Sequence, residues 1–401
     1  MKNIWKNYKT SIYLIISIII GAIVGLIFKE KTNNIKALGD LFINMLTCIV
    51  IPVIFLNITT ALGKIEKPKT ISKVLLTTFL IFLATSIISA LIGIITSNIT
   101  PLIKSNTYTY ETHALEKINY LDKFVSSLSV NNFGDLLNIN NMIALIIASI
   151  IFGLALNLSN EKGQKTLELL ESLKEVINKI IHIIMLYAPI GLGTYFAVLV
   201  GNFGGSITSS YIKTFLIYLI TSIFIYFIIY GLYAYIAGGK EGIKRYFKNI
   251  INPTITALST CSSAASIPSN CEAAKKIGIK EEIYSTTIPL GTNFHKDGSI
   301  VGSVFKIMFL IYLFNIDISF TKVLLTALIA TLLVTALPIG GGTISEMFII
   351  TMLGAPITAL PMLTIIATII DAPATVLNVV GDSASSMLVT YLLDGKNWLK
   401  Q

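Results

Sequence analysis

Long apolar segments constrain the fold of this chain more than any other feature of its sequence. Runs close to the roughly 20 residues that a helix needs to cross a bilayer recur from residue 12 to residue 392. Charged residues make up only 13% of the 401 residues, whereas soluble domains carry about 25%. The sequence therefore predicts an all-α protein that crosses a membrane many times.

The first half of the chain holds six apolar segments and sets the orientation. They cover residues 12–28, 41–62, 74–95, 142–158, 166–200 and 214–235. Basic stretches lie at the N-terminus, between the second and third segments, and after residue 235, and such stretches face the cytoplasm. We therefore expect cytoplasmic N- and C-termini and an external loop at 101–140. No small-residue cleavage site follows the first segment, so it is interpreted as a retained helix.

Composition excludes several other classes of protein. The formal charge of +9 comes from lysines in short loops, which argues against a nucleic-acid partner. Cys48, Cys261 and Cys271 form neither a disulfide framework nor a zinc-binding spacing. The sequence contains neither the GxSxG nor the HExxH motif, so an enzyme is not expected. Heavy use of Lys, Ile and Asn is typical of a low-GC bacterium and suggests the cytoplasmic membrane.

After residue 248 the apolar segments become short and interrupted. The stretch 252–275 reads as two half-length helices around a small polar tip, flanked on both sides by basic loops. Such a stretch cannot cross the membrane and predicts a re-entrant hairpin, which is tolerated only where protein encloses it. A second hairpin is predicted at 321–360, with its tip in LPIGGGT at 337–343. A pair of interrupted segments points to the binding site of a transporter.

Three consecutive ionisable residues interrupt the apolar segment 283–310. They are His295, Lys296 and Asp297, within the sequence IPLGTNFHKDGS. Lys296 lies 13 residues after Ile283, or roughly 20 Å along a helix, which is too far for its side chain to reach water. Ionisable residues at that depth mark a binding site or an ion path.

The last apolar segment, 362–392, carries a polar stripe. Asp371, Thr375, Asn378 and Asp382 follow one another at helical spacing. Two carboxylates on one face of such a segment are expected to face an interior cavity. Pro373 loosens or bends the helix at the same place.

Together these motifs resemble the glutamate transporter homologues, also called sodium:dicarboxylate symporters. The motifs are TCIVIPVIF at 47–55, STCSSAASIP at 259–268, IPLGTNFHKDGS at 288–299, LPIGGG at 337–342 and DAPATVLNVVGD at 371–382. The resemblance implies eight membrane helices, two re-entrant hairpins, a homotrimer and an elevator mechanism. Scaffold helices would lie in 1–70 and 101–210, and the transport domain would comprise 71–100 and 211–401.

The resemblance also implies roles for individual residues. Backbone amides at Ser262 and Ser263 would hold the substrate carboxylate, with Asp371, Thr375 and Asn378 completing the site and Pro338 and Gly340 on the covering hairpin. Asp382, with carbonyls near Gly291 and Asn378, would bind one sodium ion. Asp297, with Thr85 and Ser86, would bind another.

Two departures from the family pattern concern substrate and coupling ion. Ala374 stands where relatives that carry acidic substrates have an arginine, and the only arginine of the chain is Arg245. His295 and Lys296 replace an Asn-Met pair that precedes the retained Asp297. The sequence therefore provides no guanidinium clamp and adds positive charge to a cation site.

We therefore expect a transporter of small neutral amino acids with no cofactor, in which Lys296 and His295 reduce sodium coupling or replace it by proton coupling. The alternative is a sodium-coupled symporter of acidic amino acids or dicarboxylates, in which Lys296 grips the distal carboxylate. A channel is a further alternative, because glycine-rich re-entrant tips also build selectivity filters.

Overall fold

The computed structural model describes residues 2–63, 73–103, 130–138, 141–203, 205–332, 343–396 and 398–400, which form helices and no β-strand. The first half comprises α1 (Lys2–Phe28), η1 (Lys29–Ile35), α2 (Lys36–Gly63), α3 (Lys73–Ile99), η2 (Phe133–Leu137), α5 (Met142–Leu158) and α6 (Glu161–Phe203). Next come α7 (Gly205–Phe224), η4 (Ile225–Ile229), α8 (Tyr230–Asn249), α9 (Ile251–Thr260) and α10 (Ser263–Ile277). The remainder comprises α11 (Glu281–Phe294), α12 (Asp297–Phe314), α13 (Phe320–Leu332), α14 (Thr343–Leu353), η5 (Ile357–Ala359), α15 (Leu360–Asp394) and η6 (Trp398–Lys400).

Each apolar segment identified in the sequence is helical, and one prediction needs correction. The segment 283–310 was expected to be a single helix, but α11 ends at Phe294 and α12 starts at Asp297. His295 and Lys296 between them have non-helical dihedral angles. The two halves meet end to end because Asp297 starts a new helix instead of continuing the old one.

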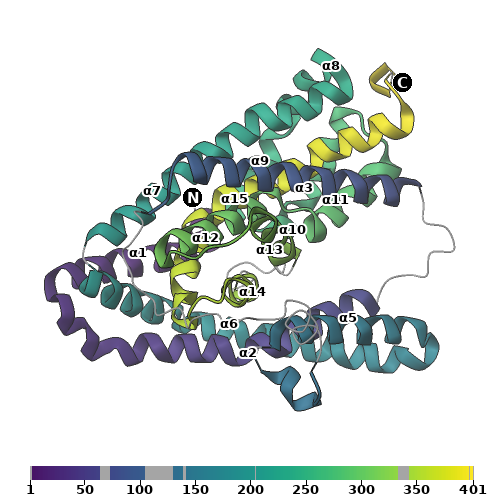
Figure 1. Cartoon of the computed structure of the whole chain (residues 1–401). Helices are drawn as coiled ribbons and strands as arrows, with labels where there is room; N and C mark the ends of the chain where they lie inside the picture. The colour runs from purple at the N-terminus through teal and green to yellow at the C-terminus, as the bar shows by residue number, and fades with distance from the viewer. Residues whose placement is uncertain are drawn as a thin grey trace.

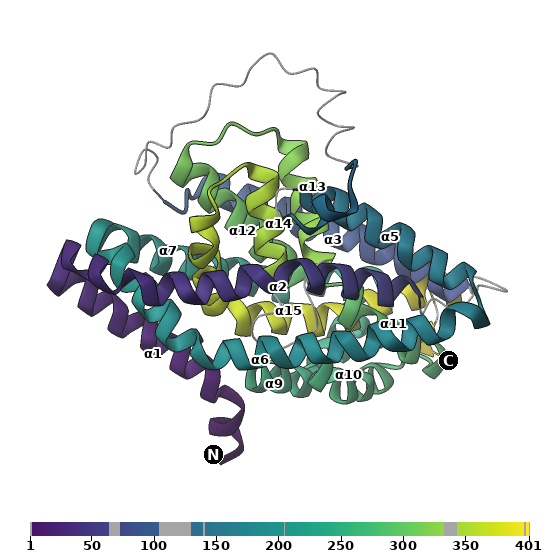
Figure 2. The ribbon, with the colours of Figure 1, turned by 90° about the horizontal axis from the view of Figure 1, so that it is seen from below.

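The helices pack in two groups. In the first group α6 packs against α1 and α2, and α2 packs against α5. In the second group α15 packs against α3, α7, α8, the pair α9–α10, α11 and α12. Figure 1 shows α2, α5 and α6 in one layer and the second group in another, and Figure 2 shows α2 and α6 crossing in front of α15.

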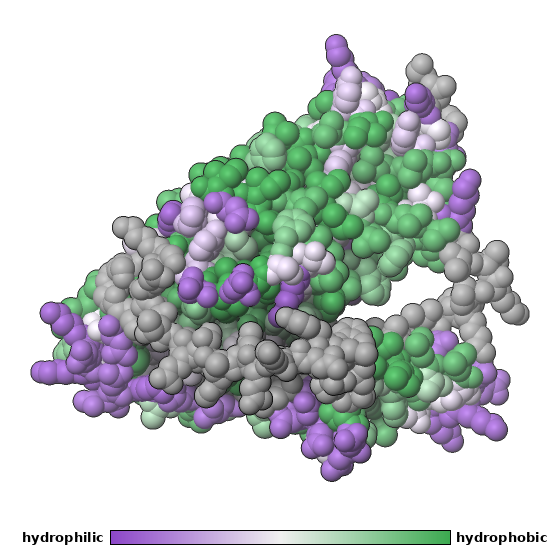
Figure 3. All heavy atoms as spheres, in the orientation of Figure 1, coloured by the Kyte–Doolittle hydropathy of each residue, from purple (hydrophilic) through white to green (hydrophobic). Residues whose placement is uncertain are grey.

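Large apolar side chains cover much of the surface, as a membrane protein requires. Among the residues that the structure describes, four helical spans are long and apolar enough to cross a membrane: Lys73–Ile99, Ile207–Asn249, Glu281–Phe314 and Ile357–Asp394. Figure 3 shows hydrophobic residues across the middle of the molecule and hydrophilic residues near α8, the C-terminus and the turn between α1 and α2. The expected total of eight crossings stays a prediction.

Two pairs of short helices pack against α15 and α12. In the first pair α9 and α10 contact each other, and Cys261 at their junction has a left-handed backbone with φ of 47°. Asn270 of α10 donates a hydrogen bond to the Val379 carbonyl, and Ser383 donates one to Asn270. In the second pair α13 contacts α14, and the tip at 337–343 lies outside the described residues except for Thr343, where α14 begins.

Tyrosine hydroxyls bind backbone carbonyls around the break between α11 and α12. Tyr218 donates to the Gly298 carbonyl, Tyr230 to that of Leu377 and Tyr246 to that of Val380, at 2.8 to 3.0 Å. All three tyrosines are fully buried, and a buried carbonyl without a partner is costly. These bonds fix α7 and α8 against the part of the molecule that carries the polar residues.

Candidate functional site

The break between α11 and α12 places charged residues at two helix ends. His295 caps α11, and its backbone N–H still bonds the Gly291 carbonyl. Asp297 lies in the first turn of α12, where the positive end of the helix dipole favours a negative charge. The polar sequence between the two half-helices thus lies inside the bundle instead of in a loop at its surface.

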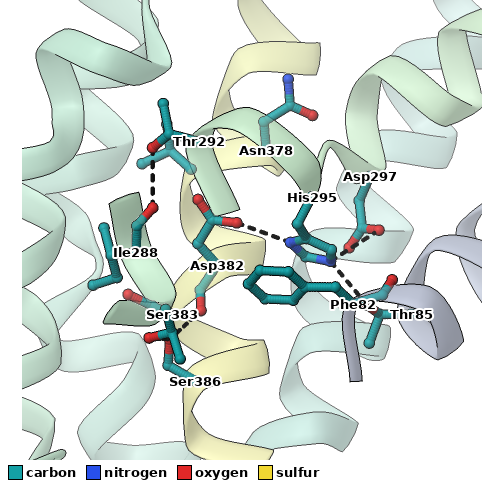
Figure 4. A network of polar contacts seen from close by, with 12 residues as sticks. Phe82, Thr85, Ile288, Thr292, His295, Asp297, Asn378, Asp382, Ser383 and Ser386 are labelled. Atoms are coloured by element: carbon teal, nitrogen blue, oxygen red, sulfur yellow. Dashed lines mark hydrogen bonds and ion pairs between the residues drawn. The ribbon is translucent and has the colours of Figure 1, made fainter. Parts of the chain in front are cut away.

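His295 lies between two carboxylates that come from different helices. Its Nδ1 is 2.8 Å from Asp382 Oδ1 of α15, and its Nε2 is 3.3 Å from Asp297 Oδ1 of α12. Figure 4 shows the ring between these two carboxylates. The exposed fractions are 0% for His295 and Asp297 and 2% for Asp382, so all three groups are shielded from water.

Helix α3 closes this cluster from the other side. Thr85 Oγ1 lies 2.8 Å from His295 Nε2, and the Phe82 ring stacks on the imidazole at a centroid distance of 4.4 Å. Ser86, which was predicted to act with Thr85, is buried next to it. The structure therefore brings Thr85, 210 residues away in the sequence, into the site that contains His295.

The two acidic residues have different further neighbours. The Tyr230 hydroxyl of α8 lies 3.1 Å from Asp297 Oδ2 and shares its one proton between this carboxylate and the Leu377 carbonyl. Ser386 donates to the backbone carbonyl of Asp382 at 2.7 Å. Gly291 packs so closely against Asp382 that an added Cβ would collide with the carboxylate. Gly291 therefore acts through the absence of a side chain.

Lys296 is also buried, with 4% of its surface exposed. It precedes α12 and lies within electrostatic range of Asp382. The prediction that this lysine stays inside the protein is consistent with this placement. The contact predicted from sequence, with Lys296 as the main cation beside Asp297 or Asp382, needs refinement because His295 contacts both carboxylates directly.

The predicted substrate residues lie on α15 and at the junction of α9 and α10. Asp371 is partly buried and within electrostatic range of Cys261 at that junction. Ser262 is the N-cap of α10, and its hydroxyl accepts a hydrogen bond from the Ala265 N–H. The backbone N–H of Ser263 lies at the start of α10, where helices bind anions.

Two further predicted residues lie on α15, and two cannot be placed. Thr375 and Asn378 are buried at 5% and 7% exposure. Both polar atoms of the Asn378 side-chain amide make hydrogen bonds with Ser299. The amide oxygen accepts from the Ser299 N–H and the amide nitrogen donates to the Ser299 hydroxyl, each at 3.1 Å. Pro338 and Gly340 lie outside the described residues.

A second buried charge pair was missed in the sequence. Lys306 of α12 lies 3.5 Å from Glu346 of α14, with side-chain exposures of 6% and 1%. Thr364 of α15 donates to the same carboxylate at 2.6 Å. The rule that singled out Lys296, an ionisable residue within an apolar helix, applies equally to both residues. The roles of Phe82 and Tyr230, by contrast, left no signal in the sequence.

Replacing Gly291 with alanine is expected to displace Asp382 from His295. The added methyl group meets the carboxylate, and overpacking of this kind costs about 1–3 kcal/mol. We expect a lower melting temperature and weaker substrate uptake. Gly231→Ala is the matched control, because its Cβ would make only ordinary contact with Phe247 at 3.4 Å. Equal effects of the two substitutions would contradict the proposed collision.

Half-length helices whose ends and buried charges meet inside an apolar bundle are typical of secondary transporters. Comparison with known proteins then identifies the family. The family model of the sodium:dicarboxylate symporters matches residues 11–392, and the chain belongs to this family. Membership makes the protein a multi-pass membrane transporter, as the sequence predicted.

Its relatives include proteins with two kinds of name. A C4-dicarboxylate transport protein of Rhodospirillum rubrum is 27% identical over 338 residues, which is 80% of this chain and 73% of that relative. A proton/sodium-glutamate symport protein of Geobacillus stearothermophilus is 26% identical over 395 residues, or 94% of this chain and 93% of that relative. A C4-dicarboxylate transport protein of Rhizobium leguminosarum is 26% identical over 343 residues.

Proposed function

We propose that the protein is a cation-coupled secondary transporter of an acidic substrate, either an acidic amino acid or a dicarboxylate. The geometric observation behind it is the position of Asp371, on α15 and within electrostatic range of the α9–α10 junction, which suits the amino group of an amino acid. The names of the relatives support the acidic class. They favour it over the small neutral amino acids that the sequence first suggested.

The two sides of this site suit the two ends of an amino acid. The start of α10 offers backbone N–H groups to a carboxylate, and Asp371 offers a negative charge to an ammonium group. A dicarboxylate would satisfy the first of these partners and leave the second without one. Among acidic substrates, the geometry therefore favours an amino acid.

The distal carboxylate of an acidic substrate needs a cation, and Ala374 does not supply it. Lys296 is a buried lysine that lies between the predicted site residues His295 and Asp297 in the sequence. A lysine binds a carboxylate as a point charge. Lys306 is engaged with Glu346. We propose that Lys296 supplies positive charge for the distal carboxylate.

A small neutral amino acid is the second candidate, because the uncharged Ala374 stands where relatives that carry acidic substrates have an arginine. Ala374 is buried beside Gly298, so that a Cβ added at Gly298 would collide with the Ala374 backbone. The close approach of α12 and α15 there leaves little room around residue 374. A substrate without a distal carboxylate would require no partner at this position.

The two packing groups suit an elevator mechanism. We propose that α1, α2, α5 and α6 form the scaffold, which would assemble as a homotrimer. The second group, α3 and α7 through α15, would then carry the substrate across the membrane as one body. The pairs α9–α10 and α13–α14 would be the re-entrant hairpins of that body.

Uptake by purified protein in liposomes tests the substrate class. We expect unlabelled glutamate or aspartate to compete with labelled substrate at least about tenfold better than serine or alanine, which corresponds to about 1.4 kcal/mol. Lys296→Met should reduce this preference. Better competition by serine and alanine would support the neutral candidate, and better competition by succinate or malate would support a dicarboxylate. The absence of counterflow for every substrate would exclude a carrier.

A further inference from the structure

The hydrogen bonds around His295 determine how many protons its ring carries. Nδ1 faces the carboxylate of Asp382 at 2.8 Å, and an ionised carboxylate only accepts hydrogen bonds. Nδ1 therefore donates to the ionised form of Asp382. The charge of the ring then depends on whether Nε2 donates as well.

The neighbours of Nε2 favour a second donated proton. The Thr85 hydroxyl has one proton, and the Ile81 carbonyl lies 2.9 Å away to accept it. Its oxygen then accepts from Nε2 at 2.8 Å. Asp297 Oδ1, which has no hydrogen bond of its own, lies 3.3 Å from the same nitrogen. Since each of these neighbours is an acceptor, the ring is satisfied as an imidazolium with a charge of +1.

The site does not fit the sodium ions that the family resemblance predicts. A hard cation is bound by several oxygen ligands that converge on it, whereas Oδ1 of Asp382 and Oδ1 of Asp297 each face a nitrogen of the His295 ring. The ring fills the space between the two carboxylates, and Phe82 covers its face.

We propose that His295 is a built-in cation that takes the place of sodium between Asp382 and Asp297. This inference rests on the proposed function only in its reference to transport, since the displacement of sodium follows from the geometry alone. It assigns to His295 the role that the sequence suggested for Lys296.

The charges of the neighbouring residues are consistent with this assignment. The groups that face or surround His295 are Asp382 of α15, Asp297 of α12, the Tyr230 hydroxyl of α8 and Lys296, which precedes α12. His295 offsets one of the two negative charges of this cluster, and Lys296 lies within electrostatic range of Asp382. Asp371 is then the remaining carboxylate of the predicted set, and an amino group of the substrate can balance it.

The test measures sodium binding through thermal stability in detergent, without any substrate. An ion that binds only the folded protein raises the melting temperature. We expect sodium chloride and choline chloride to give the same melting temperature for the wild type. We expect sodium to raise that of His295→Asn, which opens the space and restores the family's asparagine. Lys296→Met serves as the matched comparison.

Each outcome decides the proposal. A sodium-dependent rise in the wild type would overturn it, as would a folded His295→Asn that gives no sodium response. A response gained by Lys296→Met alone would return the role to Lys296. If His295→Asn does not fold, the wild-type measurement decides. Because no substrate is present, a failed uptake assay would count against the proposed function and leave this result unchanged.

Discussion

Lys306→Met is expected to lower the free energy of unfolding by about 3–5 kcal/mol, the cost of leaving one member of a buried ion pair without its partner. Glu346, with 1% of its side chain exposed, would lose the ammonium group 3.5 Å away. Thr364 would remain as a hydrogen-bond donor, but it carries no charge. The low-dielectric surroundings make an unpaired carboxylate far more costly than it would be in water.

The double variant Lys306→Met/Glu346→Gln separates pairing from simple loss of packing. Because both charges disappear together, we expect it to regain most of the stability lost in the single variant. Thermal unfolding in detergent measures both variants. Lys248→Met, at an exposed position on α8, should change the free energy of unfolding by no more than about 0.5 kcal/mol. Additive losses in the double variant would show that the two residues are not coupled.

Asp371→Asn is expected to weaken amino acid binding by about a hundredfold. The substitution keeps the shape of the side chain and removes the charge that we assign to the substrate ammonium group. Loss of one partner from a desolvated charge pair costs about 2–5 kcal/mol, and about 2.7 kcal/mol corresponds to a hundredfold change in affinity. Asp371 is partly buried, so the lower end of that range applies.

Substrate chemistry provides the control for this prediction. A dicarboxylate without an amino group should bind Asp371→Asn at least as well as the wild type, because no favourable contact is lost. Asp317→Asn, at an exposed position beyond the end of α12, should leave the affinity unchanged. Displacement of a labelled substrate from the purified protein measures all of these affinities. Equal losses for both substrate classes would show that Asp371 supports the fold instead of binding the amino group.

The buried charged residues of the second helix group form two clusters. We assign one cluster to the stability of the fold and the other to transport. Lys306 and Glu346 compensate each other and connect α12 to α14. His295 contacts Asp382 and Asp297 and connects α12, α15 and α3. Within the part of the chain that the structure describes, Asp371 has no such charged partner, which leaves its carboxylate available to the substrate. A charge that already has a partner contributes little to binding, which is why we assign recognition to Asp371.

Hydropathy by itself predicted the helices and the interruption between α9 and α10. The reason is that the length and spacing of apolar residues determine which segments can be buried as helices. The break at His295 and Lys296 was visible as an anomaly, although its geometry was not. The polar stripe from Asp371 to Asp382 was likewise correctly placed on one helix, because a helical repeat is a local property.

The tertiary structure alone decided which charges meet. His295 and Lys296 are adjacent and equally anomalous in the sequence, but the non-helical backbone between α11 and α12 brings only the ring of His295 between the two carboxylates. Thr85 and Phe82 reach that ring through the packing of α3 on α12 and α15, and Glu346 reaches Lys306 through the packing of α14. Such pairings depend on contacts between distant segments, whereas hydropathy and periodicity describe each segment by itself.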